Sequence, residues 1–137
     1  GYLYGLSIVF SENICPTGWH VPNIDEWKEL TDFVGSNDGL KLKSKSGWYN
    51  DSYNNDGNGT DDFGFSSLPS GVYDASSDDI FEEAGYNARY GSSTIKYGSV
   101  FFLSLSCGSN DTFISYIDLF EEEETEVGVS IRCVKDN

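Results

Sequence analysis

The chain has 137 residues and a formal charge of −15, from 23 acidic and 8 basic side chains. This length is typical of one domain, so we expect a single domain spanning residues 1–137. A field of this sign repels phosphate backbones and anionic lipid surfaces, which argues against binding nucleic acid or membrane surfaces. No apolar run approaches the length of a membrane-spanning helix, so direct membrane insertion is not expected.

Three cysteines, Cys15, Cys107 and Cys133, permit one disulfide and one leftover thiol. A Cys15–Cys133 bridge would close a loop of nearly the whole chain and would imply an oxidising compartment. Zinc binding is the alternative, although the sequence has no CxxC or HxxxH pair and His20 is its one histidine. Residues 1–10 have neither a basic start nor a small-residue cleavage site, so we do not expect them to form a signal peptide.

The clearest helix is predicted over residues 23–34. Asn23 is suited to cap its first turn, and Glu26 stands where a capping box requires a glutamate. Four apolar side chains recur at helical spacing and predict a face that packs on the core: Ile24, Trp27, Leu30 and Val34. Gly35 follows as a stop signal.

The rest of the chain divides into a polar loop and a strand-rich final third. Residues 40–46 alternate leucine and lysine over a stretch too short to distinguish a strand from a helix. Residues 50–62 are almost wholly Asn, Asp, Gly and Ser, which favour turns. Alternating apolar residues predict strands at 100–107, 113–120 and 127–134, with Cys107 as a buried, inert thiol.

Five glutamates, Glu121 to Glu124 and Glu126, separate the last two predicted strands. We interpret them as a solvated hairpin tip, with a site for a cation or a basic partner as the alternative.

Several segments, in the right order, resemble one protein family. They are ICPTGWHVP at 14–22 followed by DEW at 25–27, KLKSKSGW at 41–48, NGTDDFGFSSLP at 58–69 and GVSIRCV at 128–134. These are similar to the CPSGWHVPxxxEWxxL, KLKSxSGW, NGTDxxGFSxLP and GFSVRCV motifs of the Fibrobacter succinogenes major paralogous domain. At 89–94 the chain has RYGSST where the family usually has YWWSST, so any aromatic platform there is reduced.

The resemblance implies a C-type-lectin-like fold, a Cys15–Cys133 disulfide, and a place in an exported protein of Fibrobacter or Bacteroidetes-type bacteria. The fold class we expect is therefore α+β, with a mixed antiparallel sheet, one or two helices and a long irregular loop region. The family's own activity is unassigned.

Tyrosines among Asn, Ser and Gly are typical of adaptable binding surfaces, so we predict ligand contacts at Tyr49, Tyr53, Tyr86 and Tyr90. The same region is rich in the hard oxygen ligands that calcium prefers, and the candidate ligands are Asp51, Asp56, Asn58 and Asp61. The match to an EF-hand loop fails because Asp61 occupies the required glycine. The sugar–calcium signature of C-type lectins is also missing. Bonding of these side chains to the loop backbone is the ordinary alternative.

Catalytic motifs are sparse. No GxSxG motif or phosphate-binding glycine loop is present. His20, with Asp25 or Glu26 to orient it, and Cys107 are the only candidates for enzyme chemistry. We therefore expect a non-catalytic recognition or adhesion module of a secreted or cell-surface bacterial protein, which binds glycan or protein through its loops. The alternatives are a spacer or assembly domain without a ligand and, more remotely, a Cys- or His-dependent enzyme.

Overall fold

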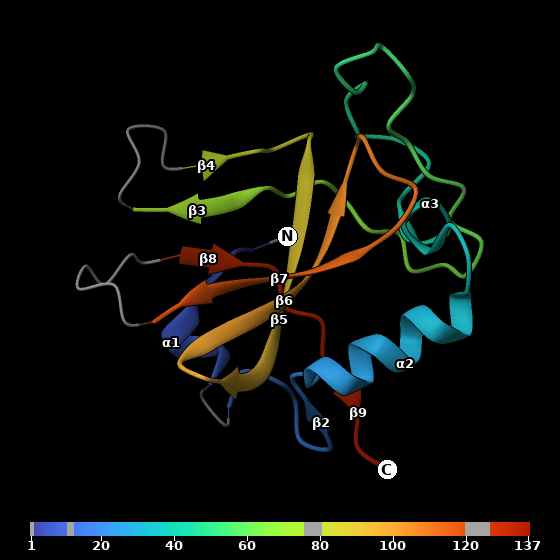
Figure 1. Cartoon of the computed structure of the whole chain (residues 1–137). Coiled ribbons are helices and arrows are strands. Elements are labelled where there is room, and N and C mark those ends of the chain that lie inside the picture. The colour runs from blue at the N-terminus through green and yellow to red at the C-terminus, as the bar shows by residue number, and fades with distance from the viewer. Residues whose placement is uncertain (1, 11–12, 76–80, 120–126) are drawn as a thin grey trace.

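The computed structural model describes residues 2–10, 13–75, 81–119 and 127–137 (Figure 1). Helices and antiparallel strands are mixed along these ranges, which confirms the α+β class. The expected single sheet with one or two helices is wrong, because the described residues form three helices and their strands divide among three sheets. None of the described helices is long and apolar enough to cross a bilayer.

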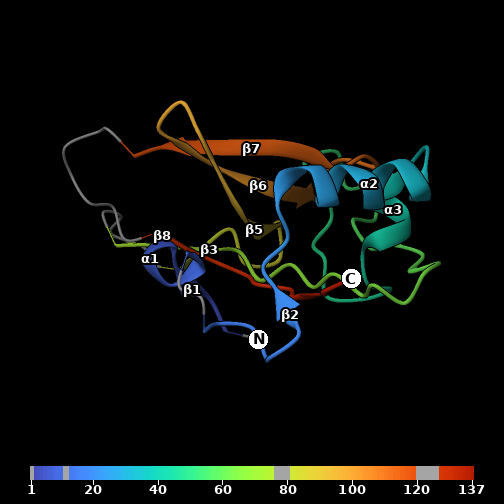
Figure 2. The same ribbon diagram turned by 90° about the horizontal axis from the view of Figure 1, so that it is seen from below.

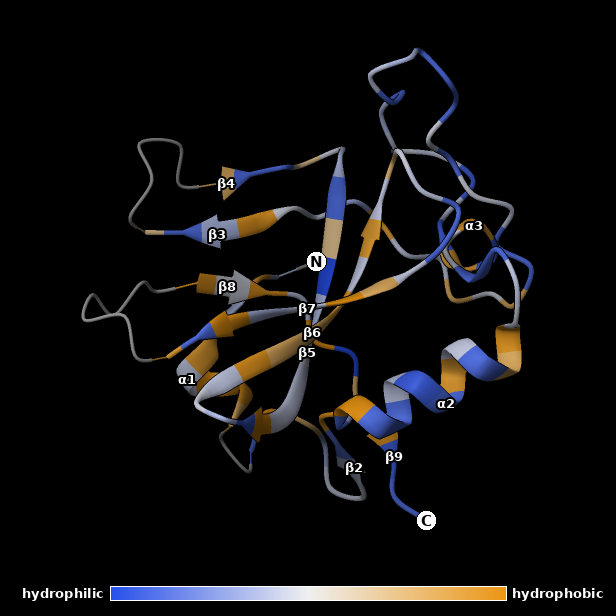
Figure 3. Cartoon of the chain, in the orientation of Figure 1, coloured by the Kyte–Doolittle hydropathy of each residue, from blue (hydrophilic) through white to orange (hydrophobic). Residues whose placement is uncertain are grey.

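Helix α2 (Ile24–Val34) confirms the prediction for residues 23–34. The Asn23 side chain accepts a hydrogen bond from the Glu26 backbone N–H, and the Glu26 carboxylate accepts one from the Asn23 N–H, both at 2.9 Å. The helix ends at Gly35, whose N–H donates to the Thr31 carbonyl. Apolar and polar residues alternate around α2 (Figure 3), and its apolar face lies on the core.

The ambiguous segment at residues 40–46 is helical at its start and extended afterwards. Helix α3 (Asp38–Leu42) ends at Lys43, which forms a parallel bridge with Ser67. The Asp38 carboxylate accepts hydrogen bonds from the Thr112 N–H and hydroxyl, at 2.7 and 2.6 Å. These bonds join α3 to Thr112, which directly precedes the strand that begins at Phe113.

Strands β5 (Asn87–Lys96), β6 (Ser99–Ser106) and β7 (Phe113–Asp118) form a three-stranded antiparallel sheet. The strands predicted at 100–107 and 113–120 are confirmed as β6 and β7. Both faces of β6 are buried. On one face Leu103 and Leu105 pack under α2 and Trp48. On the other face, Val100 and Phe102 pack against Val9, Val127 and Val129.

A second sheet has the strand order β1 (Tyr4–Gly5), β8 (Val127–Val129), β3 (Val72–Asp74) and β4 (Phe81–Glu82). Together with helix α1 (Leu6–Val9) it lies at one end of the molecule, and α2 and α3 lie at the other (Figure 2).

The prediction of a single strand over 127–134 is wrong, because this segment contains β8 and the start of a separate strand at Val134. After β8, Ser130 leaves the sheet and forms a parallel bridge to β5, where its N–H donates to Arg89 and its carbonyl accepts from Gly91. The chain then continues to β9 (Val134–Lys135), which pairs with β2 (Trp19–His20).

The predicted hairpin between the last two strands is also wrong. Strand β7 pairs with β6, whereas β8 pairs with β1 and β3, so the two strands belong to different sheets. The glutamates at 121–124 and 126 lie outside the described residues.

The Cys15–Cys133 disulfide is present, with Cα atoms 5.8 Å apart across a sequence separation of 118 residues. It lies beside the β2–β9 pair and covalently joins the two ends of the chain. Zinc binding by these two thiols is therefore excluded. Cys107 is a free cysteine and is partly buried.

Candidate functional site

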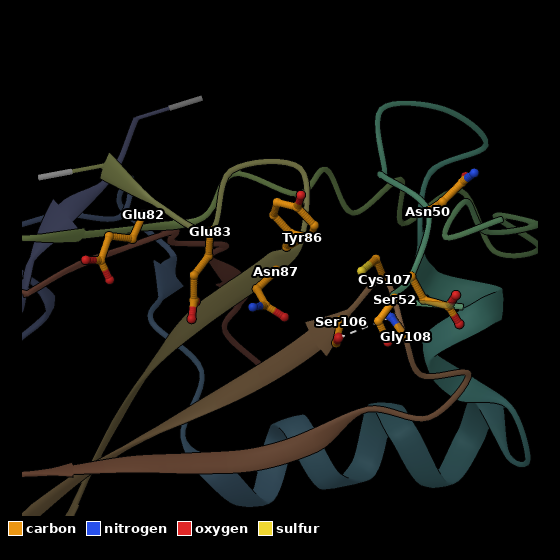
Figure 4. Close-up of a pocket in the computed structure, with 10 residues that line it drawn as sticks. Asn50, Ser52, Glu82, Glu83, Tyr86, Asn87, Ser106, Cys107 and Gly108 are labelled. Carbon is orange, nitrogen blue, oxygen red and sulfur yellow. Dashed lines mark hydrogen bonds between the residues drawn. The ribbon is translucent and has the colours of Figure 1, made fainter. Parts of the chain in front are cut away.

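An open cleft of about 870 Å³ lies between the polar loop and the ends of β4, β5 and β6 (Figure 4). Three segments line it: Asn50, Asp51 and Ser52; Glu82, Glu83, Tyr86 and Asn87; and Ser106, Cys107 and Gly108. Most of these side chains are amides, hydroxyls or carboxylates, which donate or accept hydrogen bonds to a polar ligand.

Tyr86 is the aromatic side chain of the cleft and remains 49% exposed. Its ring packs edge-on against that of Tyr49, with centroids 5.0 Å apart and an interplanar angle of 83°. The Tyr49 N–H donates to the Gly85 carbonyl at 2.8 Å, which fixes the backbone beneath this ring pair. The pair is therefore a pre-formed feature of the cleft rim.

Gly85 is required where the two tyrosines meet. Its φ of +87° lies in the left-handed region, and a Cβ added there would come within 2.6 Å of the Tyr49 ring. The Cys107 N–H donates to the Tyr86 carbonyl at 2.8 Å, so the same turn is also held to the end of β6.

Of the four tyrosines predicted to contact a ligand, the structure brings Tyr49 and Tyr86 together. Tyr53 lies on the same loop as Asn50 and is exposed, but it is not among the residues that line the cleft.

The prediction for Tyr90 is wrong, because its side chain is only 4% exposed. Tyr90 pairs with Leu103 in the sheet, which places its ring on the face covered by α2. Its hydroxyl donates to Ser67 Oγ at 3.0 Å, and burial raises the pKa of this phenol. Tyr90 is therefore part of the core.

The candidate calcium ligands order the loop backbone. Asp51 accepts hydrogen bonds from Tyr53, from the Asn55 N–H and from Asn55 Nδ2. The Asn55 side-chain bond is the main reason that the pKa of Asp51 is lowered. Asp51 thus has the structural role that short acidic side chains often have in turns.

The remaining candidates are engaged in a similar way. Asp56 accepts from the Asn58 N–H and side chain, and Asn58 in turn accepts from the Trp48 N–H. Asp61 accepts from the Ser66 N–H and hydroxyl, and the hydroxyl bond is the main cause of its lowered pKa. Within the described ranges, no three His, Cys, Asp or Glu side chains are grouped closely enough to hold a metal ion. Calcium binding stays a prediction.

Lys43 lies beneath the cleft, and sequence analysis did not single it out. It is only 1% exposed, and its Nζ donates to the Ser106 and Ser109 carbonyls at 3.1 and 3.0 Å. Burial lowers the pKa of Lys43, and the neighbouring Cys107 and Asp56 oppose that shift. The buried ammonium group therefore fixes the backbone of residues 106–109, of which 106–108 line the cleft.

His20 lies away from the cleft, between two carboxylates. Its Nε2 is 2.8 Å from Glu26, and its Nδ1 is 2.5 Å from Asp136. The hydrogen bond to Asp136 is the main cause of the raised pKa of the imidazole, and the hydrogen bond to Glu26 adds to it. Glu26 is one of the two predicted orienting residues, whereas Asp136 was not predicted. His20 thus connects β2 to α2 through Glu26 and to the C-terminal residues through Asp136.

Comparison with known families gives one match. The family described as the Fibrobacter succinogenes major domain matches residues 1–135. No curated protein and no solved structure matches the chain.

Proposed function

We propose that this chain, which belongs to the Fibrobacter succinogenes major domain family, is a non-catalytic recognition module that binds a neutral or amino-bearing glycan in the cleft beside Tyr86. The observation on which the proposal depends is the pre-formed Tyr49–Tyr86 ring pair at the rim of a polar cleft.

The composition of the cleft favours a sugar. Sugar rings present apolar C–H faces together with many hydroxyl groups, so they require both an aromatic surface and dispersed polar partners. Tyr86 offers the first, while Asn50, Asn87 and Ser52 offer the second. A purely apolar ligand would use none of these polar groups, of which the Asn50 amide also donates to Asn54 within the loop.

The charge of the cleft narrows the class of glycan. Asp51, Glu82 and Glu83 line it, and no lysine or arginine is among its lining residues. Arg89 bonds Glu83 at 3.2 Å but does not itself line the cleft. A sugar carboxylate or sulfate would be repelled there, whereas a neutral sugar or an amine would not.

Several features support a binding role over catalysis. His20 has carboxylates on both ring nitrogens, which leaves neither free to act as a general base on a substrate. Cys107 lines the cleft without a histidine beside it, since the one histidine of the chain is bonded to Glu26 and Asp136.

We also infer that the module is exported and that its fold is of the C-type-lectin-like kind. The disulfide supports an oxidising compartment. The pairing of β2 with β9, which brings the chain ends together, and the long irregular stretch between α3 and β3 support the lectin-like arrangement.

A glycan array probed in the presence and absence of a calcium chelator tests the proposal. We expect binding to neutral or amino-bearing glycans and little to acidic ones. We expect binding to persist in the chelator, because the candidate calcium ligands are already engaged by the loop. An absence of binding to every glycan would contradict the proposal and favour the spacer alternative.

A further inference from the structure

Strand β7 has an open backbone edge. The Leu119 N–H donates to the Gly98 carbonyl, so these residues form a hydrogen-bonded pair. Because hydrogen-bonded and non-hydrogen-bonded pairs alternate in an antiparallel ladder, Ile117, Ser115 and Phe113 point their backbone groups toward β6. The N–H and C=O groups of Ile114, Tyr116 and Asp118 therefore point outward.

The opposite edge of the same sheet is closed. On β5, the Asn87 carbonyl accepts from Gly71, the Arg89 carbonyl accepts from Ser130, and the Gly91 N–H donates to Ser130. Strand β5 also has an irregular register between Gly91 and Ile95. Nothing comparable covers β7: its outward backbone groups have no hydrogen-bond partner in the part of the chain that the structure describes.

The side chains of β7 do not protect this edge. Proteins commonly shield open edges with prolines, bulges or charged residues. Strand β7 has six residues, FISYID, of which only Asp118 is charged, and its pairing with β6 is unbroken. Phe113 and Tyr116 are 47% and 62% exposed, one on each face of the strand. Figure 2 shows β7 at the outer boundary of the sheet.

The charge near β7 indicates what kind of strand fits. Neither β7 nor its neighbour β6 carries a lysine or arginine, and Asp111 and Asp118 stand near the two ends of β7. With a net charge of −15, a second copy of the chain would be repelled. A segment with basic ends would be attracted.

We propose that the β7 edge binds an extended segment of another protein, with alternating β-branched residues and a lysine or arginine at each end, as an added strand. The backbone of that segment bonds to the outward groups of Ile114, Tyr116 and Asp118. Its side chains cover Tyr116 on one face and Phe113 on the other, as cross-strand neighbours do. This surface is separate from the glycan cleft.

The test uses a capped peptide of alternating valine and threonine with two lysines at each end. Its binding to the chain is followed by amide chemical shifts and by hydrogen exchange. We expect the amides of Ile114 and Tyr116 to gain protection. We expect Tyr116→Lys to weaken binding about tenfold or more, through lost contact and like charge. Tyr97→Lys, at a side chain that is 97% exposed on the β5–β6 turn, is the matched control and should bind as the parent chain does.

Three outcomes would overturn the proposal. The first is an absence of peptide-induced shifts at β7. The second is equal binding of a peptide with the same charge and a central proline, because that would show attraction by charge without strand pairing. The third is self-association of the chain through β7 in the absence of peptide, which would assign the edge to a second copy.

Discussion

Tyr49 and Tyr86 contact edge to face at 5.0 Å, although one belongs to the polar loop and the other to the turn before β5. Edge-to-face pairs of this kind contribute about 0.5–1.5 kcal/mol beyond their buried area. The contact connects the loop to the sheet, so the rim of the cleft is assembled by the fold before a ligand arrives.

Gly85→Ala should remove the space on which the ring pair depends. The new Cβ would collide with the Tyr49 ring and would also require an unfavourable φ. We expect a loss of about 2–4 kcal/mol in the free energy of unfolding, measured by urea titration. Gly64→Ala is the control, because Gly64 has a φ of +68° with no atom within 4 Å of the added Cβ. If both variants lose the same free energy, the clash with Tyr49 has no role.

Lys43→Met should weaken the attachment of residues 106–109, of which 106–108 line the cleft, to the protein interior. The methionine keeps most of the side-chain volume but leaves the Ser106 and Ser109 carbonyls without their donor. We expect a destabilisation of about 1–3 kcal/mol and faster hydrogen exchange of the Cys107 and Ser109 backbone amides, which bond to the Tyr86 and Ser106 carbonyls. Lys45→Met changes an exposed lysine two residues away and should do neither. Unchanged exchange of the Cys107 and Ser109 amides in Lys43→Met would contradict this role.

His20 should titrate above its usual range, and because the chain has one histidine, its proton signal is unambiguous. The hydrogen bonds to Asp136 and Glu26 raise its pKa from 6.5. The folded state therefore holds the proton more tightly than the unfolded state does. The resulting stabilisation is complete below pH 6.5 and is lost as the pH rises through the raised value.

The substitution Asp136→Asn should return the His20 pKa toward 6.5, as followed by NMR titration. Asp25→Asn should leave it nearly unchanged, because Glu26 and not Asp25 bonds the ring. The shift should shrink in high salt, since the imidazole is partly exposed. An equal effect of the two substitutions would show that general charge, and not the Asp136 bond, sets the pKa.

Removal of the Cys15–Cys133 disulfide should destabilise the chain by about 2–5 kcal/mol, because the bridge closes a loop of 118 residues in the unfolded state. The check is urea unfolding with and without reductant, and in the Cys15→Ala/Cys133→Ala double variant. Cys107→Ser should keep the full sensitivity to reductant. Equal stability in both redox states would contradict the prediction.

The parts of the fold that sequence analysis predicted are those encoded locally. The capping box at Asn23 and the helical spacing of Trp27 are properties of adjacent residues, so α2 was predicted almost to the residue. The alternation in β6 and β7 is also local. The break after Val129 was not predictable, because it depends on bonds from Ser130 to a strand forty residues earlier.

The same division holds for the site. Tyr49 and Tyr86 were predicted from their polar surroundings, and so was Tyr90, whose burial depends on the face of β5 that α2 covers. Lys43 was missed because a lysine between leucines gives no sign of burial in the sequence. Glu82, Asn87 and Ser106 were missed because only the tertiary fold brings the ends of β4, β5 and β6 to one cleft.

The most direct test of the glycan-binding proposal is an NMR titration of the chain with a neutral or amino-bearing oligosaccharide selected from the array. We predict amide shifts in the segments 50–52, 82–87 and 106–108, and their loss in Tyr86→Ala but not in Tyr97→Ala. Shifts confined to other regions, or an unchanged affinity of Tyr86→Ala, would contradict the proposal.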